Sequence, residues 1–448
     1  MSKRTETDLT QGSITKQLVL FFLPVAAGTW FQQLYNAVDA VIVGRFVGTE
    51  ALAAVGGSAA NLINLLIGFF VALASGASVI IAQYWGAGKK EETADAVGTA
   101  LTFSFIIGVV LSLICTPASE WMLRLLKVPE DTLQDATDYL KICFSCAGVV
   151  MLLNTESSIL RAVGDSRRPF IYMLISCVAN IGLDLLFVIR FHLGVKGVAY
   201  ATIASEVLNF LLLTVDLCLR KTAYRIDFKR LGIVRSAYRR MMRIGVPSGL
   251  QSAMYSVSNT VLQSAVNTLG TVVVASWSLS GKLDGFYWAT SNAAGIAIVT
   301  FIGQNYGAGR MDRVDACAKK GLRLFFLVTV VMSAVIVAIA PTALPLFTED
   351  ATVASTTYTI ILYFVPFYFV WTAIEVISGV LRGCSDVTAS VIITGIGICL
   401  FRVIWVFTAF QIWHTLFVIS ISYLLSWIIT GAALLIYYKK GTWRTNPH

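Results

Sequence analysis

The sequence predicts an all-α polytopic membrane protein with twelve transmembrane helices. Of its 448 residues, 57% are hydrophobic and only 13% are charged, with a mean hydropathy of +0.76. A soluble domain carries about 25% charged residues, so lipid must surround most of this chain. Apolar stretches of the roughly 20 residues that a bilayer-crossing helix needs recur along the sequence. They lack the residue-by-residue alternation of a barrel strand, and a backbone in lipid must satisfy its own hydrogen bonds, so we expect helices.

Short polar segments separate the predicted spans. The spans lie near residues 15–43, 52–82, 95–117, 134–158, 169–190, 197–219, 240–267, 272–303, 317–340, 353–380, 388–409 and 413–438. Several exceed the length of a perpendicular helix and should tilt, bend or extend beyond the membrane. The residues before the first span contain no cleavable signal sequence, so we expect that helix to stay in the mature protein.

The basic residues predict the orientation. If the amino terminus is cytoplasmic, most of the 34 Lys and Arg residues fall in the inner loops and tails, as the positive-inside rule requires. We therefore expect a multi-pass protein of the inner (plasma) membrane with both termini cytoplasmic. The densest basic segment joins the two halves and contains Arg220, Lys221, Arg225, Lys229, Arg230, Arg235, Arg239, Arg240 and Arg243. It fixes the topology or, alternatively, contacts anionic lipid.

An internal repeat divides the chain into two halves. Ile81–Lys89 returns as Ile302–Arg310, and the Leu160-Arg161 pair with Asp165 returns 221 positions later. The repeat predicts a six-helix lobe at 1–219, a basic cytoplasmic linker at 220–238, and a second six-helix lobe with a short tail at 239–448. Because each half holds an even number of spans, the halves are parallel and their pseudo-twofold axis lies along the membrane normal. This arrangement predicts a central cleft and alternating access.

Ionisable residues inside the first six spans point to an ion pathway, because charges within a membrane usually face a cavity, a partner or a proton path. Asn180 and Asp184 are one helical turn apart, as are Thr202 and Glu206. With Asp39 and Asn154 they could carry a proton or coordinate a small cation. A structural hydrogen-bond network is the competing interpretation.

The second half carries a different set. Lys282, Asp284 and Glu375 either neutralise one another or form a second acidic site or cavity. Around them lies an aromatic and thioether set that could line a substrate cavity or simply pack; its members are Gln251, Met254, Tyr255, Phe286, Tyr287 and Trp288. In the first half, Pro24 removes a backbone hydrogen bond from the helix that carries Asp39 and allows a bend there.

Several segments together resemble one known family. They are Pro24–Asp39, Gly48–Val55, Gln83–Gly88, Leu160–Asp165, Asn180–Asp184 and Gln304–Gly309. On these segments the chain resembles the multidrug and toxic compound extrusion (MATE) family over essentially all twelve spans. The resemblance implies a V-shaped pair of lobes that exports amphipathic, often cationic compounds in exchange for protons or sodium.

The resemblance also implies site residues. In the family, a cation site of the first lobe maps onto Asp39, Asn154, Asn180 with Asp184, and Thr202, with Tyr139 as a further member, and the bending proline maps onto Pro24. Any Na⁺ would bind at Asp39 and Asp184. Glu206 departs from the family pattern by adding an acid. The acidic site of the second lobe in some relatives is only partly matched by Asp284 and Glu375, because Gln251 and Tyr255 stand where another acid would be expected.

Other functions fit less well. A lipid-linked precursor flippase of the same wider superfamily is the alternative, but its cleft would need more basic residues. The chain has only three His and no HExxH motif, so we predict no enzymatic activity, no metal centre and no cofactor beyond the coupling H⁺ or Na⁺. A passive channel would need a charged ring or a filter motif. We expect a monomer that handles small-molecule drugs or toxic compounds and binds no nucleic acid.

Overall fold

The computed structural model describes residues 8–48, 51 and 54–444, and within these ranges every regular element is a helix. The first half contains α1 (Ile14–Ile42), η1 (Val43–Val47), η2 (Val55–Ala59), α3 (Ala60–Gly86), α4 (Lys90–Leu125), α5 (Glu130–Ser145), α6 (Ala147–Ala162), α7 (Arg167–Asp184), η3 (Leu185–Arg190) and α8 (Gly194–Leu219). Half of the Gly48–Val55 segment, and the predicted start of the second span at 52, lie outside the described residues.

The second half follows a short η4 (Phe228–Arg230). It contains α9 (Arg235–Asn267), α10 (Thr271–Gly307), α11 (Met311–Ala343), η5 (Leu344–Leu346), α12 (Ala351–Phe364), η6 (Val365–Phe367), α13 (Tyr368–Gly383), α14 (Val387–Thr394), η7 (Gly395–Leu400), α15 (Phe401–Phe407), α16 (Ala409–Ile412), α17 (Leu416–Lys440) and η8 (Thr442–Arg444).

The predicted all-α membrane fold is confirmed. Among the described residues, ten helical segments are long and apolar enough to cross a membrane, and the pair α5 and α6, bent by 52° at Cys146, makes an eleventh. The remaining predicted span corresponds to α9. That helix has 33 residues, ample length for a bilayer at 1.5 Å per residue, but arginines near its start and many Ser, Gln and Asn residues lower its hydropathy.

The helix boundaries repeat with the period found in the sequence. The starts of α1, α4, α5 and α6 return 221 residues later as the starts of α9, α11, α12 and α13, and the end of α3 returns as the end of α10. Local sequence in the two halves therefore directs the same succession of helices.

By contacts, the described chain forms two compact units. Unit 1 comprises Leu23–Gly249 with Gly307–Gly309, and unit 2 comprises Leu9–Phe22, Leu250–Tyr306 and the chain from Arg310 onward. The division passes through α1 and α9, so each of these helices contributes residues to both units. The sequence-based division at 1–219, 220–238 and 239–448 stays a prediction about the repeat.

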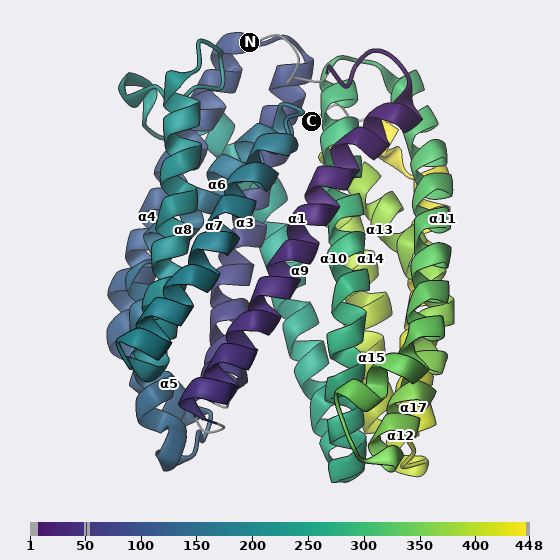
Figure 1. Cartoon of the computed structure of the whole chain (residues 1–448). Helices are drawn as coiled ribbons and strands as arrows, with labels where there is room; N and C mark the ends of the chain where they lie inside the picture. The colour runs from purple at the N-terminus through teal and green to yellow at the C-terminus, as the bar shows by residue number, and fades with distance from the viewer. Residues whose placement is uncertain (1–7, 49–50, 52–53, 445–448) are drawn as a thin grey trace. The chain divides into compact units, whose positions relative to one another are not determined.

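Unit 1 packs α4 against α5 and α6, and α8 against α5, α6 and α7 (Figure 1). The α4–α6 contact depends on two glycines. A Cβ atom on Gly108 would collide with the Cα atom of Gly148 and lie 3.2 Å from the Ala147 carbonyl oxygen. Membrane helices approach this closely only where small residues face each other, since dispersion contacts between backbones then provide the attraction.

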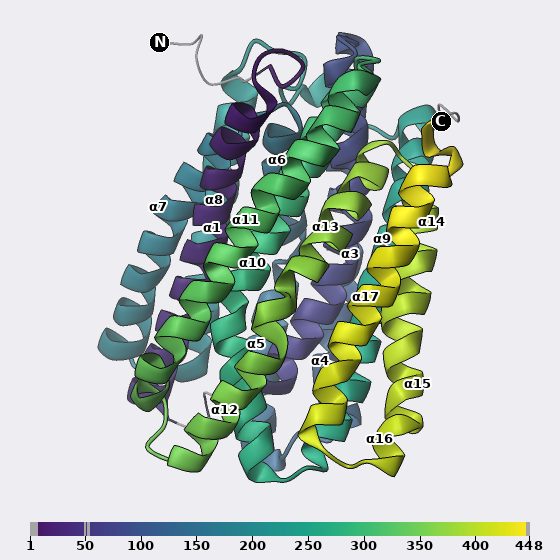
Figure 2. The ribbon, with the colours of Figure 1, turned by 90° about the vertical axis from the view of Figure 1, so that its right-hand side faces the viewer.

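Unit 2 is built around α13 and α17. α13 packs against α11 and α17, and α17 also contacts α12, α14 and α15; Figure 2 shows α11, α13, α17 and α14 side by side. The start of the described chain is tied to this unit, because Arg313 donates hydrogen bonds to the carbonyl oxygens of Leu9 and Gly12, at 3.0 and 2.9 Å. The Phe22 ring meets the Phe325 ring edge-on at 5.1 Å.

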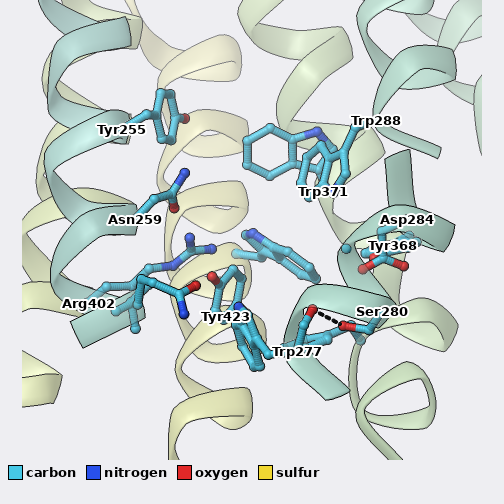
Figure 3. Close-up of a pocket in the computed structure, with 15 residues that line it drawn as sticks. Tyr255, Asn259, Trp277, Ser280, Asp284, Trp288, Tyr368, Trp371, Arg402 and Tyr423 are labelled. Carbon is cyan, nitrogen blue, oxygen red and sulfur yellow. Dashed lines mark hydrogen bonds between the residues drawn. The ribbon is translucent and has the colours of Figure 1, made fainter. Parts of the chain in front are cut away.

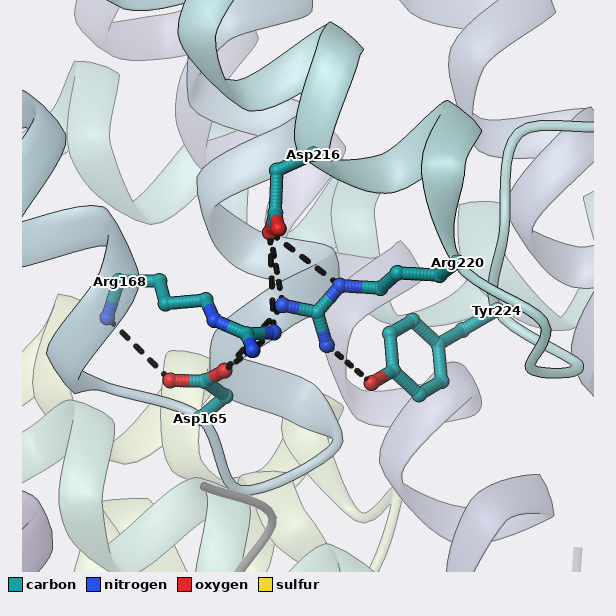
Figure 4. Close-up of polar contacts among 5 residues, drawn as sticks. All are labelled: Asp165, Arg168, Asp216, Arg220 and Tyr224. Carbon is teal, nitrogen blue, oxygen red and sulfur yellow. Dashed lines mark hydrogen bonds and ion pairs between the residues drawn. The ribbon is translucent and has the colours of Figure 1, made fainter. Parts of the chain in front are cut away.

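A charged network joins α7 and α8 at one end of unit 1 (Figure 4). The buried Asp165 carboxylate pairs with Arg168 at 3.4 Å and with Arg220 at 3.5 Å. Asp216 accepts from Arg220 at 2.7 Å and lies 3.8 Å from Arg168, and Arg220 also donates to the Tyr224 hydroxyl. Two carboxylates thus balance two guanidinium groups, and Asp165 belongs to the repeated Leu160–Asp165 segment.

Replacing Asp165 by Asn should destabilise unit 1 by about 3 to 5 kcal/mol, because it leaves two guanidinium groups facing one carboxylate in a buried setting. Thermal unfolding in detergent measures the loss. Asp227→Asn is the matched control: Asp227 is partly exposed, and the Lys229 backbone N–H and Arg225 hold the pKa of its carboxyl below its usual range. Both variants thus remove one negative charge. Equal melting temperatures for the two variants would contradict the role of the network.

The basic segment between the halves is partly neutralised by acids. Arg220, Arg225 and Arg230 pair with Asp216, Asp227 and Asp95. Among the described residues, the remaining segment cations without an ion pair are Lys221, Lys229, Arg235, Arg239 and Arg243; Arg240 donates to the Gln83 and Tyr84 side chains. The predicted contact with anionic lipid, if it forms, therefore falls to those five side chains.

Candidate ion site and cavity

Two aspartates from different helices of unit 1 meet in its interior. Asp39 lies on α1 and Asp184 is the last residue of α7. Their carboxyl groups are close enough to form a hydrogen bond, which requires one of them to carry a proton. Asp184 is 0% exposed, and in the described part of the chain no other group donates to either of its oxygens. This arrangement suits the uptake and release of a cation.

Asn180 adds neutral polar atoms to the same helix face. It lies one turn before Asp184, it is 1% exposed, and both its amide nitrogen and its amide oxygen lack a partner among the described residues. Buried polar atoms are nearly always hydrogen-bonded to protein or to water. A cluster of such atoms without protein partners is therefore a place where water or an ion can bind. The cluster therefore offers polar atoms that are not used by contacts among the described residues.

Both aspartates adjoin irregular helix. The π-helical η3 begins directly after Asp184, η1 begins four residues after Asp39, and η1 and η3 contact each other. π-helical turns are rare and occur often at functional sites, because they leave backbone carbonyls incompletely bonded and shift the side chains that follow. The sequence gives no simple signal for these turns.

The other predicted members of the first-lobe site lie at different places around the aspartates. Tyr139 on α5 is close enough to Asp39 to sense its charge, and it approaches Cys143. Glu206 on α8 lies near Tyr35 and Cys143. Asn154 donates its amide to the Val150 carbonyl oxygen of its own helix at 2.8 Å. Thr202 makes no side-chain hydrogen bond among the described residues.

Two further ionisable residues of unit 1 were not singled out from the sequence. Tyr35 lies one turn before Asp39 and is near Glu206, Asp39 and Asp184. Its i, i+4 spacing from Asp39 on α1 is the sequence signal that could have identified it. Glu156 on α6 is 1% exposed and accepts a 2.7 Å hydrogen bond from Thr214. It is an ionisable residue inside the predicted span 134–158. In the described chain, no three His, Cys, Asp or Glu residues are grouped to hold a metal ion.

In unit 2 the predicted mutual neutralisation of Lys282, Asp284 and Glu375 is wrong. Glu375 instead forms an ion pair at 2.7 Å with Arg382, which lies on the same face of α13. Lys282 is exposed and, in the described chain, has no ion pair. Asp284 points to the other side of α10 and is 8% exposed; the Tyr368 hydroxyl can donate to it, and one of its oxygens has no partner among the described residues.

Asp284 faces a cavity of about 550 Å³ inside unit 2 (Figure 3). Eight aromatic side chains form most of the wall, including Trp277, Trp288, Trp371 and Trp427. The Trp288 and Trp371 rings meet edge-on at 5.1 Å. Small-molecule sites commonly enclose about 300 to 1,000 Å³ and combine an apolar wall with a few polar groups. This cavity has the size and the lining of such a site.

The structure divides the predicted cavity residues. Tyr255 and Trp288 line the cavity. Gln251 instead donates a 2.6 Å hydrogen bond to Thr394, and Met254 packs against Gly395. Tyr287 is buried outside the lining: its ring stacks on Tyr368 at 3.9 Å, and its hydroxyl donates to the Tyr368 carbonyl oxygen.

Arg402 lines the cavity and was not assigned to a site from the sequence. It extends from α15 into the cavity wall, where it lies with Tyr423 and Trp427 of α17. The aligned repeat could have found these two aromatic residues, because they stand 221 positions after the predicted site residues Thr202 and Glu206.

Known proteins share this sequence pattern and fold. A family model described as MatE matches residues 24–186 and 247–408, once in each half. The probable multidrug resistance protein YoeA of Bacillus subtilis is 29% identical over 382 residues, covering 84% of this chain and 82% of its own. The probable multidrug resistance protein YpnP of the same organism is 27% identical over 452 residues, covering 98% and 97%.

A solved structure, the outward-facing conformation of a multidrug resistance MATE family transporter of the MOP superfamily, has the same fold. It matches with a TM-score of 0.89 at 24% identity over 98% of both chains. Because the MatE model covers most of the sequence, the resemblance predicted from the motifs is confirmed. The chain belongs to the MatE family of multi-span membrane transporters.

Proposed function

We propose that the protein is a secondary antiporter that exports amphipathic organic compounds in exchange for a cation taken up at Asp39 and Asp184. The observation that carries the proposal is the contact between the two carboxyl groups, with Asp184 fully buried and the unpartnered Asn180 amide one helical turn away. The relatives YoeA and YpnP of this chain are described as probable multidrug resistance proteins, which supports drug-like cargo.

The proton is the favoured coupling ion. Two carboxyl groups in hydrogen-bonding contact can share a proton without any further ligand, whereas Na⁺ needs several oxygen atoms around it. Coupling then follows from competition: occupancy by the cation favours one conformation, cargo favours the other, and the two ligands lower each other's affinity. We place the transporter in the plasma membrane with both termini cytoplasmic, as the basic residues predict.

The alternative, a flippase for lipid-linked pyrophosphates, receives less support. Such a cargo carries several negative charges and would need several cations near it. The cavity lining of unit 2 contains one arginine, no lysine and one aspartate.

Purified protein in liposomes tests the proposed function. An imposed pH gradient or, separately, an imposed Na⁺ gradient should drive ethidium against its concentration gradient. If one proton enters per ethidium cation, the exchange is electroneutral, and each unit of pH difference provides about 1.4 kcal/mol, which supports roughly tenfold accumulation. We expect the pH gradient to drive transport. Ethidium movement that only equalises concentrations, or that ignores both gradients, would reject antiport.

A further inference from the structure

Arg402 is a buried cation without an acidic partner. Its side chain belongs to a residue that is 4% exposed, and its Nε donates a 3.0 Å hydrogen bond to the Ser426 hydroxyl. The guanidinium carbon lies 3.8 Å from the centre of the Tyr423 ring. No carboxylate pairs with it anywhere in the described chain, although nine other Lys and Arg side chains of the described residues form ion pairs with acids.

A lone buried guanidinium is costly, because an arginine stays charged and its charge loses its hydration. The hydroxyl of Ser426 and the face of Tyr423 offset only part of that cost, since cation–π contacts and neutral acceptors are weaker than a carboxylate. The terminal nitrogens of the guanidinium make no hydrogen bond to described residues and belong to the cavity wall. They are available to an anionic group of a bound molecule.

The cavity presents opposite charges at two places. Figure 3 shows Arg402 and Asp284 on opposite sides of it, with aromatic side chains around them. The two form no ion pair. An aromatic molecule seated between them would stack on the tryptophan and tyrosine rings, and its two ends would meet charges of opposite sign.

The repeat shows that this charge pattern differs from that of the ion site. The position 221 residues before Arg402 is Ile181, which lies between Asn180 and Asp184. At the same spacing, Tyr423 matches Thr202 and Trp427 matches Glu206. The second half therefore has a cation where the first half has an isoleucine, and aromatic rings where the first half has a hydroxyl and a carboxyl group. A ligand of different charge should bind there.

We propose that the unit 2 cavity binds planar aromatic zwitterions, with a carboxylate of the ligand on Arg402 and a cationic group near Asp284. This inference adds a ligand class to the proposed function. It rests on the proposed function only in assuming that the bound molecules are exported. The carboxylate completes the unsatisfied fork of Arg402 with two parallel charge-assisted hydrogen bonds. The aromatic wall holds the flat ring system, and Asp284 selects the positive end.

Two rhodamine dyes test this site without transport. Rhodamine 110 carries a cationic xanthene and a free benzoate, and rhodamine 123 is its methyl ester. Binding to the purified wild-type protein in detergent is followed by dye fluorescence anisotropy and by quenching of tryptophan fluorescence. Rhodamine 110 should bind about tenfold more tightly, or better, because only the free acid can form charge-assisted hydrogen bonds to Arg402. Equal affinities, or tighter binding of the ester, would overturn the proposal without any variant.

Substitutions then assign the two ends. Arg402→Gln should weaken rhodamine 110 about tenfold and leave rhodamine 123 nearly unchanged, and Arg402→Lys should fall between, because it keeps the charge and loses the fork. Asp284→Asn should weaken both dyes. Arg323→Gln, the same change at an exposed α11 arginine, is the control and should alter neither. Equal weakening of both dyes by Arg402→Gln would show that Arg402 only supports packing and would overturn the proposal.

A small inorganic anion is the remaining outcome that would overturn it. If chloride fills the guanidinium fork, rhodamine 110 should bind no more tightly than rhodamine 123 in chloride buffer, and a preference for the acid should appear only after gluconate replaces chloride. Liposome transport separates this inference from the proposed function: loss of ion-driven ethidium transport rejects the antiporter, whereas dye selectivity in detergent depends only on the cavity.

Discussion

Asp184→Asn is expected to abolish ion-driven export while leaving the protein folded. Asparagine has nearly the same shape, but it cannot ionise and cannot share a proton with Asp39. Since Asp184 is fully buried and makes no other hydrogen bond to described residues, the substitution breaks no structural contact. In liposomes with a pH gradient of one unit, accumulation of ethidium should fall from about tenfold to the background of protein-free vesicles.

The controls for this result use the same chemical change elsewhere. Asp39→Asn should reproduce the loss, because the proton needs both carboxyl groups. Asp95→Asn alters an exposed acid of α4 that pairs with Arg230 at 3.5 Å, and it should transport normally. Wild-type accumulation by Asp184→Asn would reject the assignment of the ion site. Cargo binding in detergent should survive in all three variants.

Gly108→Ala is expected to have the largest effect on stability. The added methyl group would enter the backbone of Gly148 on the neighbouring helix, and a backbone cannot rotate away as a side chain can. Separating α4 from α6 would loosen contacts along both helices, so we expect a loss of about 3 kcal/mol or more, at the upper end of overpacking effects. Heating in detergent followed by size-exclusion chromatography measures the surviving folded fraction.

Gly68→Ala provides the matched comparison. This glycine is also inside a helix of unit 1, but a Cβ atom there would meet nothing within 4 Å. Alanine is the better helix former by about 1 kcal/mol, so the variant should be as stable as the wild type or more so. If Gly68→Ala and Gly108→Ala melt alike, helix propensity rather than close packing governs both positions.

Much of the fold could be predicted because the physical constraints on it are local. A helix in lipid satisfies its own hydrogen bonds, so twenty apolar residues suffice to predict one, whatever its neighbours. The repeat was equally visible, and the helix starts at Lys90 and Met311 keep its spacing. α9 shows the limit of hydropathy alone, because its polar residues lower the apolar signal. The repeat, not composition, identifies it as the counterpart of α1 in the second half.

The candidate sites were predicted only in part. Residue type and helical spacing placed Asn180 and Asp184 on one face and suggested Asp39 as a partner, and the family resemblance implied the same residues. Which charges pair could not be predicted, because that depends on contacts between helices: Glu375 meets Arg382 rather than Lys282. Helix spacing also failed for Tyr287, which stacks on Tyr368 outside the cavity.

By itself, the sequence determined the all-α membrane class, the twofold repeat, the family and the candidate acids of the first half, because each depends on hydropathy, spacing or motif within single segments. Only the tertiary structure decided that Asp39 reaches Asp184, that Gly108 and Gly148 let two helices touch, and that Arg402 shares an aromatic cavity with Asp284. These facts depend on how helices distant in sequence rotate and pack against one another. The sequence pattern of a single helix shows which of its faces is apolar, but it does not show how the helix is rotated against a neighbour that is distant in sequence.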